Sequence, residues 1–115
     1  MVIERGEIWW AALSEPRGSE PGFERPVLIV QSNEFNSSRI RTTLAVVITS
    51  NIRLATAPGN VLLSKKVSGL PKESVANVSQ VITLDKNFLI KKIKKLAKQE
   101  LASVNAGLQL VFELG

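Results

Sequence analysis

The chain alternates short apolar runs rich in β-branched residues with polar segments that contain Gly and Pro, a pattern typical of a β protein. Strands are predicted at 7–13, 26–32, 42–50 and 59–63, and the alternation over 74–84 fits one bent strand or two joined strands. Residues 27–30 form a continuous apolar run, so the second strand is expected to be buried on both faces. Pro26 disfavours a helix immediately before it.

The connections between these strands are polar. Residues 14–24, SEPRGSEPGFE, form a long loop, and long loops in compact domains are often functional. Residues 33–39 are predicted as a turn or a single helical turn that Asn33 caps. Residues 51–58 are predicted as a second irregular loop.

Helical spacing appears near the end of the chain. An amphipathic stripe there predicts a final helix with Gly115 as its stop. The stripe comprises Leu101, Val104, Leu108 and Val111. Residues 89–96 fit either a helix or a strand. Five or six short strands with one or two late helices predict a mainly β fold, a small barrel-like domain covered by helix.

Composition limits the number of domains, the expected location and the kinds of metal site. The 115 residues, 44% of them hydrophobic, suit one domain over 1–115 with one core. No apolar run reaches the roughly 20 residues of a membrane span, and the charged N-terminal segment lacks the apolar core of a signal peptide, so a cytoplasmic location is expected. The sequence has no cysteine, which excludes disulfides and thiolate metal sites.

The absence of histidine excludes several enzyme classes. Histidine is the usual general base near neutral pH and a common zinc ligand. Serine and cysteine triads, HExxH peptidases and ribonucleases with a histidine pair are therefore ruled out. An enzyme with this sequence must use Arg, Lys, carboxylates, hydroxyls and backbone dipoles.

The net charge of +5 indicates a polyanionic partner. A lysine cluster near the C-terminus is interpreted as a solvated face. It comprises Lys91, Lys92, Lys94, Lys95 and Lys98. The arginines are better candidates for phosphate contact, because a guanidinium can bind two oxygens at once. They are Arg5, Arg17, Arg25, Arg39, Arg41 and Arg53.

Arg25 stands at the junction of the first loop and the second strand. Strands 26–32 and 42–50 are consecutive and joined by a short connection, so they are expected to pair. If they are antiparallel, Arg25 lies close to Thr49, where the third strand ends. Thr49, Ser50 and Asn51 then form a polar group that holds a phosphate or hydroxyl, or one that satisfies loop backbone. An Arg at such a junction can equally serve only as a loop salt bridge.

A guanidinium and a hydroxyl suit phosphodiester cleavage by the neighbouring 2′-hydroxyl, since negative charge gathers on the non-bridging oxygens in the transition state. The candidate proton acceptors are Glu20 and Glu24, of which Glu24 is more typical of a solvated charge. No metal or cofactor is expected, because no aspartate cluster could hold magnesium and Asp85 is the only Asp.

Aromatic side chains offer possible stacking surfaces for RNA bases. Trp9 and Trp10 are adjacent on a strand, so at most one of them faces a given surface, and core or interface packing is expected for at least one. Phe23 in the first loop is the better candidate for ligand contact.

Together these segments resemble the MazF/PemK family of toxin endoribonucleases. The matching stretches are RGEIWW (5–10), RGSEPGFERPVLIVQS (17–32), FN (35–36), TSN (49–51), PGNVLL (58–63), SVANVSQVITLDK (74–86) and the final helix. They cover nearly the whole chain in order.

The resemblance implies a compact SH3-like β barrel of the CcdB/PemK type, with a small additional sheet and a C-terminal α-helix, assembled as a homodimer. It implies metal-independent cleavage of single-stranded RNA to 2′,3′-cyclic phosphate and 5′-hydroxyl ends, and inhibition by a cognate antitoxin. It also implies a short strand near 91–96. The essential Arg and Thr of the family match Arg25 and Thr49, and a loop carboxylate matches Glu20.

RNA contacts are expected from a further set of side chains, of which Gln80 is assigned by the resemblance. The set is Arg17, Phe23, Ser50, Asn51, Arg53 and Gln80. Ser79 stands where some members carry an acid, which leaves the general base open. Two other functions remain: a toxin like the gyrase poison CcdB that binds a protein target, and an RNA-binding barrel without turnover.

Overall fold

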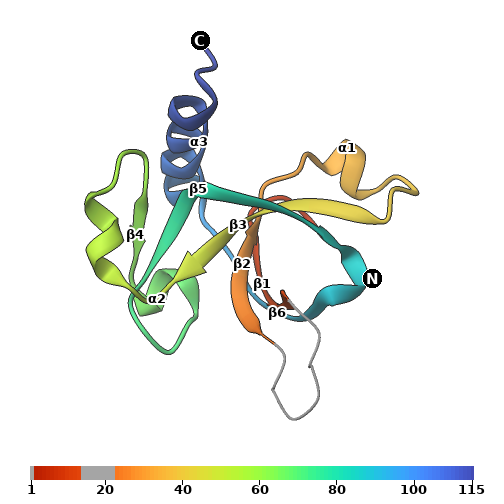
Figure 1. Cartoon of the computed structure of the whole chain (residues 1–115). Coiled ribbons are helices and arrows are strands. Elements are labelled where there is room, and N and C mark those ends of the chain that lie inside the picture. The colour runs from red at the N-terminus through yellow and green to blue at the C-terminus, as the bar shows by residue number, and fades with distance from the viewer. Residues whose placement is uncertain (1, 14–22) are drawn as a thin grey trace.

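The computed structural model describes residues 2–13 and 23–115. Six strands form one antiparallel sheet in the order β4-β5-β3-β2-β1-β6, curled into a half-barrel (Figure 1). The strands are β1 (Glu7–Ala12), β2 (Glu24–Ile29), β3 (Thr42–Thr49), β4 (Val61–Leu63), β5 (Ser74–Asp85) and β6 (Leu89–Lys95). The helices are α1 (Asn33–Asn36), α2 (Lys65–Ser68) and α3 (Lys98–Phe112), with 3-10 turns at Ile52–Thr56 and Lys86–Phe88.

The mainly β fold with a C-terminal helix is confirmed. β5 is one bent strand: a bulge between its pairings with Val46 and Val47 bends it. β4 pairs only with Ser74, Val75 and Ala76, which precede the bulge in β5. The expected small sheet is therefore continuous with the barrel sheet. The segment 89–96, whose sequence fits either a helix or a strand, contains strand β6. No described helix is long and apolar enough to span a membrane.

Two predicted helix boundaries are wrong. The N-cap of α1 is Ser32, whereas the Oδ1 atom of Asn33 accepts hydrogen bonds from the Arg5 N–H (2.7 Å) and the Asn36 side chain (3.2 Å). α3 ends at Phe112 with Glu113 in the left-handed region (φ 56°), two residues before Gly115. At α1 a tertiary contact explains the difference, because the Asn33 side chain is already engaged by the Arg5 backbone.

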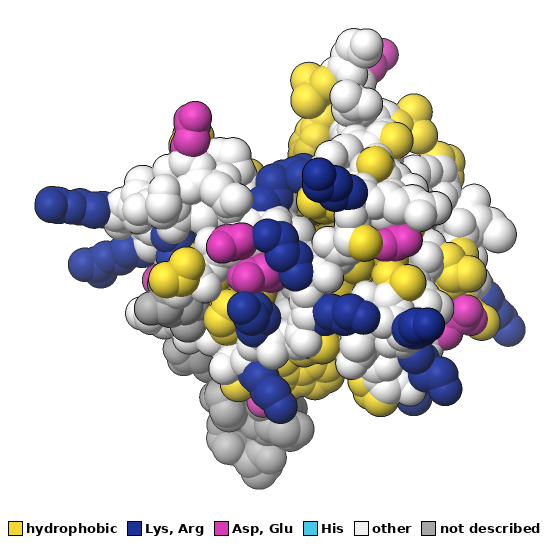
Figure 2. Space-filling model, turned by 180° about the vertical axis from the view of Figure 1, so that it is seen from behind, with side chains coloured by type: hydrophobic (Ala, Val, Ile, Leu, Met, Phe, Trp, Pro, Cys, Tyr) yellow, Lys and Arg dark blue, Asp and Glu magenta, His cyan; other side chains and the backbone are white. Residues whose placement is uncertain are grey.

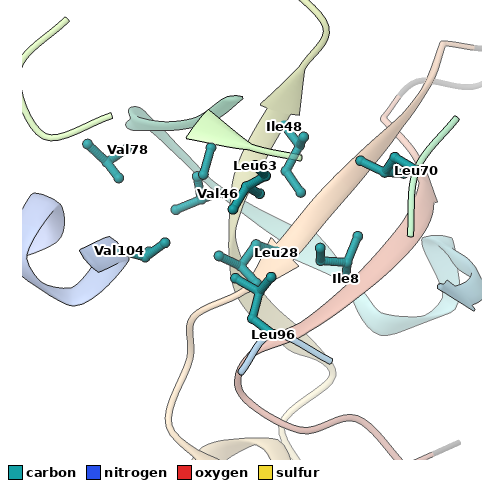
Figure 3. Packing of buried hydrophobic residues seen from close by; sticks show 10 residues of the cluster. Ile8, Leu28, Val46, Ile48, Leu63, Leu70, Val78, Leu96 and Val104 are labelled. Carbon is teal, nitrogen blue, oxygen red and sulfur yellow. The ribbon is translucent and has the colours of Figure 1, made fainter. Parts of the chain in front are cut away.

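Both faces of the sheet are buried, as the apolar run 27–30 predicted. Leu28 packs with Ile8 and Val104 on the face that α3 covers (Figure 3), whereas Val27 and Ile29 pack with the opposite cluster. β-strand side chains alternate between faces, so a strand with a core on each side must be apolar at consecutive positions.

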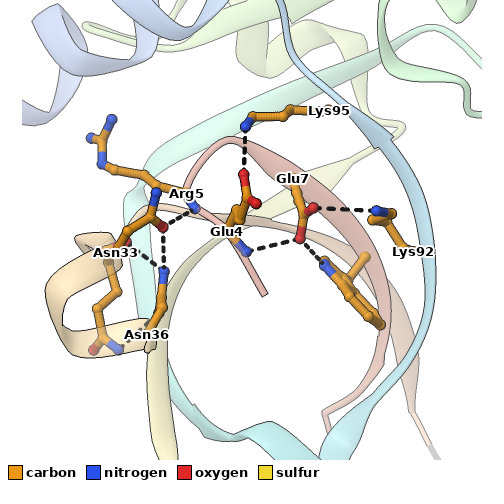
Figure 4. Close-up of polar contacts among 9 residues, drawn as sticks. Glu4, Arg5, Glu7, Asn33, Asn36, Lys92 and Lys95 are labelled. Atoms are coloured by element: carbon orange, nitrogen blue, oxygen red, sulfur yellow. Dashed lines mark hydrogen bonds and ion pairs between the residues drawn. The ribbon is translucent and has the colours of Figure 1, made fainter. Parts of the chain in front are cut away.

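A buried carboxylate, that of Glu7, anchors β1 and holds one of its two tryptophans (Figure 4). The Oε1 atom of Glu7 accepts hydrogen bonds from the Glu4 N–H (2.9 Å) and the indole N–H of Trp9 (3.0 Å), while its Oε2 atom pairs with Lys92 (3.4 Å). Trp9 is therefore held in the core. Trp10 points to the opposite face, where it is half-buried.

Candidate functional site: a pocket at the separation of β2 and β3

A pocket of about 380 Å³ opens where β2 and β3 separate. The two strands pair only from Val27↔Val47 to Ile29↔Ala45. The first half of β2 pairs with β1 alone, and the last residues of β3 pair with β5. The pocket is bounded by β1, β2, β3 and the segment that leads into β5.

Pro26 explains why the pairing stops. The Leu13 N–H donates to the Phe23 carbonyl on the β1 side, and the Val30 N–H donates to the Leu44 carbonyl on the β3 side. Backbone groups of successive residues point to opposite neighbours in an antiparallel sheet, so Pro26 faces β3, as Val30 does. Proline has no N–H to donate. The ladder to β3 therefore ends beside Pro26, and the strands can diverge.

Arg25 lies in the wall of this pocket, inside β2 rather than in the loop before it. Its guanidinium carbon lies 4.8 Å from the centroid of the Phe23 ring, a cation–π contact. It forms no ion pair with any described residue. Lys72 lines the same pocket from the segment before β5. The pocket thus presents two cations that no described carboxylate neutralises.

Thr49 is the last residue of β3, and the antiparallel pairing expected from the sequence is confirmed. The observed pairing ends at Val27↔Val47, two residues short of Arg25 on β2 and of Thr49 on β3. Because side chains alternate along a strand, Arg25 shares the face of Val27, and Thr49 shares the face of Val47. Thr49 is 9% exposed and does not line the pocket, whereas Ser50 does. The Thr49 Oγ1 atom accepts the Asn51 N–H (3.1 Å), and its hydroxyl proton has no acceptor among the described residues.

The residues after Thr49 form the rim of the site. The side chain of Asn51 caps the following 3-10 turn by accepting the Arg53 N–H (3.3 Å). Arg53 is exposed and does not line the pocket. The second loop is therefore a fixed turn rather than the irregular segment predicted.

Glu24 is exposed, which agrees with its interpretation as a solvated charge, and it is the first residue of β2. It lines the wall, and its Oε1 atom accepts the indole N–H of Trp10 (2.8 Å). The other candidate carboxylate, Glu20, and the candidate RNA contact Arg17 lie outside the described residues.

Gln80 is exposed on the bulge of β5 and is not among the residues that line the pocket. Its Oε1 atom accepts a long hydrogen bond from the Asn77 side chain (3.4 Å). Asn77 also accepts from Ser79 (3.1 Å) and Asn60 (3.2 Å), which fixes the shape of the bulge.

Several pocket residues carried no functional signal in the sequence. Leu70, Pro71, Lys72 and Ser74 reach the pocket because β5 pairs with β3. Their distance along the chain from Arg25 gives no hint of this neighbourhood. Across the described ranges, no group of three or more His, Cys, Asp or Glu side chains could hold a metal ion.

Comparison with known families assigns the chain. A family described as PemK-like, MazF-like toxin of type II toxin-antitoxin system matches residues 4–112. The chain belongs to this family. The resemblance drawn from its motifs is thereby confirmed.

Curated relatives match this PemK/MazF-family chain over nearly its whole length. Endoribonuclease MazF6 of Mycobacterium tuberculosis is 45% identical over 114 residues, which is 99% of this chain and 100% of the relative. Endoribonuclease EndoA of Bacillus subtilis is 34% identical over 114 residues, covering 99% of this chain and 97% of the relative.

Solved structures confirm the fold of this family member. A mycobacterial endoribonuclease in complex with its cognate antitoxin has a TM-score of 0.80 at 22% identity, covering 98% of this chain and 97% of the other. A MazE-MazF structure from Deinococcus radiodurans has a TM-score of 0.81 at 21% identity, covering 100% and 99%.

Proposed function

We propose that this chain is a sequence-specific, metal-independent endoribonuclease and the toxin of a toxin–antitoxin pair, acting on single-stranded mRNA in the cytoplasm. One toxin domain spans 1–115. The observation that carries the proposal is the guanidinium of Arg25, which lines a pocket without an ion-pair partner among the described residues. The high identity to proteins named endoribonucleases supports the same conclusion.

The proposed reaction is an internal transfer on phosphorus. The ribose 2′-oxygen forms a bond to the phosphorus, and the bond from phosphorus to the 5′-oxygen breaks, which leaves a 2′,3′-cyclic phosphate and a 5′-hydroxyl. The 2′-proton passes to a carboxylate, Glu20 or Glu24, and the departing 5′-oxygen takes up a proton. Charge on the non-bridging oxygens is stabilised by Arg25 and by the hydroxyl proton of Thr49.

The remaining proposed RNA contacts surround this centre. Phe23 and Ser50 line the pocket, Asn51 and Arg53 form the neighbouring turn, and Gln80 projects from the β5 bulge. Arg17 is proposed from the sequence alone. Single-stranded RNA is read by side chains that meet unstacked bases, so these positions are expected to set the cleavage motif.

The test is incubation of the purified protein with a long single-stranded RNA in excess EDTA, followed by sequencing of the fragment ends. Cuts at a defined motif with cyclic-phosphate ends support the proposal. Intact but tightly bound RNA would assign a non-catalytic RNA-binding barrel instead. Intact and unbound RNA would favour a toxin directed at a protein target.

Thr49→Ala is expected to lower the cleavage rate about 100-fold while leaving RNA affinity within a few-fold, because the hydroxyl acts on charge that exists only in the transition state. Single-turnover kinetics and binding to a non-cleavable RNA separate the two effects. Thr49→Ser keeps the hydroxyl and should retain most activity. A loss confined to affinity would contradict the transition-state role.

The cognate antitoxin is proposed to be an extended acidic segment that lies in the cationic pocket and excludes RNA. Arg25 and Lys72 supply the charge complementarity. Extended segments commonly bind by adding to a sheet edge or filling a groove.

A homodimer is proposed to form over the end of α3. Leu110, Phe112 and Leu114 are more than half exposed there. A chain with net charge +5 repels its own copy, so self-association favours an apolar surface. Arg5 borders this surface, where its guanidinium donates to the Asn105 side chain (2.6 Å).

Phe112→Ser is expected to weaken self-association at least about tenfold, measured by sedimentation equilibrium, because it removes an apolar anchor from the contact. Phe35→Ser is the matched control, since both phenylalanines are 55% exposed and Phe35 lies on α1. Equal effects of the two variants would exclude this surface as the dimer contact.

A further inference from the structure

We infer that the RNA-binding surface continues from the Arg25 pocket over Trp10 to the edge strand β6, where Lys91 contacts a further phosphate of the RNA. This inference rests on the proposed function. It revises the interpretation of the lysine cluster as a purely solvated face.

Two neighbouring hollows share a wall. The second, called here the β6 hollow, has a volume of about 350 Å³ and is bounded by Gly69 and the β6 residues Lys91, Lys92 and Ile93. A ridge formed by Trp10, Leu70 and Pro71 lines both hollows. A chain that leaves the Arg25 pocket across this ridge enters the β6 hollow directly.

The structure divides the lysines of β6 by their partners. Lys92 pairs with Glu7 (3.4 Å), Lys95 pairs with Glu4 (2.7 Å), and the Lys94 ammonium donates to the Lys66 carbonyl. The bond from Lys95 lowers the pKa of the Glu4 carboxyl below its ordinary value, and the pKa of Lys95 is raised in turn. These three cations are already engaged.

Lys91 differs from them. Within the described part of the chain, its ammonium forms no ion pair or hydrogen bond. It lies directly opposite Trp10 in the β1–β6 ladder, so the two side chains share one face of the sheet. On the far side of the ridge, Lys72 lines the Arg25 pocket and likewise has no ion-pair partner among the described residues.

The chemistry of this surface fits single-stranded RNA. Sites for single strands combine aromatic or apolar platforms with cations that follow the backbone. Here the indole of Trp10 is held by its bond to Glu24, Leu70 and Pro71 extend the apolar ridge, and unpaired lysines stand at either side. Lys and Arg side chains are spread over much of the face seen in Figure 2.

Lys91→Gln is expected to lower affinity for a long non-cleavable RNA, with a 2′-deoxy sugar at the scissile position, about threefold at moderate salt. The slope of log affinity against log salt should fall by about 0.7, the value for one phosphate contact on a single strand. A short RNA restricted to the cleavage motif should bind unchanged. Adding Lys72→Gln should reduce the slope by a similar further amount.

The matched control is Lys98→Gln, which removes the same charge from an exposed position on α3. Equal affinities and salt slopes for the Lys91 and Lys98 variants would overturn the inference, because the lysine would then serve only to protect an edge strand. Weakened antitoxin binding with unchanged RNA affinity would also overturn it and assign the β6 hollow to the protein partner.

Failure of the proposed function is distinguishable from failure of this inference. The binding assay uses non-cleavable RNA and needs no activity. A wild-type protein that cuts no RNA, yet loses affinity through Lys91→Gln, would refute the nuclease and support the extended surface.

Discussion

Arg25→Ala is expected to reduce the rate of RNA cleavage by about 100- to 1,000-fold, because it removes a preorganised donor aimed at charge that develops in the transition state. Arg25 is suited to this role by its position. β2 fixes its backbone, the Phe23 ring lies 4.8 Å from its guanidinium carbon, and no described carboxylate occupies it. Single-turnover cleavage with saturating enzyme measures the effect on the chemical step.

Two variants sharpen this experiment. Arg25→Lys keeps the charge but loses the planar fork that binds two oxygens, so only partial activity is expected. Arg39→Ala removes the same charge from an exposed position outside the pocket and should cleave nearly as fast as the wild type. Cleavage by Arg25→Ala at the wild-type rate, with the fold verified by circular dichroism, would refute the assignment of the site.

Gly107→Ala is expected to destabilise the fold by about 2 kcal/mol or more, although the same change usually stabilises a helix. A Cβ atom at Gly107 would lie 2.2 Å from the Gly59 carbonyl oxygen and 3.1 Å from Val78. Gly59 itself has φ +79° and cannot easily move aside. The close approach of α3 to the turn before β4 therefore requires a residue without a side chain at position 107.

Urea denaturation of the two proteins measures this difference. Ser103→Ala, at an exposed position of the same helix, is the control and should change stability by less than about 0.5 kcal/mol. An unchanged or higher midpoint for Gly107→Ala would show that the helix can shift without cost. A parallel decrease in RNA affinity is not expected at low temperature, because Gly107, Gly59 and Val78 do not line the Arg25 pocket.

Much of the site could be located from local chemistry. The polar residues that close the third strand, the Pro before an apolar run and the Arg at the junction of loop and strand all lie within short segments of sequence. The expectation that consecutive antiparallel strands bring Arg25 towards Thr49 needed only their order, and the antiparallel pairing of these strands is confirmed from Val27↔Val47 to Ile29↔Ala45.

Other parts could not be read from the chain. Glu24 is exposed, as its interpretation as a solvated charge implies, but its hydrogen bond to Trp10 and its place in the pocket wall follow from the pairing of β1 with β2. The lysines of β6 look equivalent in sequence, whereas the carboxylates of Glu4 and Glu7 neutralise two of them and Lys91 forms no ion pair with any residue that the structure describes. Partners of this kind are set by sheet pairing across more than 80 residues, and no local pattern encodes that pairing.

The sequence by itself determined the strand segments, the final helix, the family and the exclusion of histidine chemistry, because these depend on residue type and spacing along the chain. The tertiary structure alone decided where β2 and β3 part, which segment before β5 completes the pocket, and which lysine of β6 has no partner among the described residues. Those features arise from contacts between distant residues, whose geometry is fixed only once the sheet has curled and both of its faces are packed.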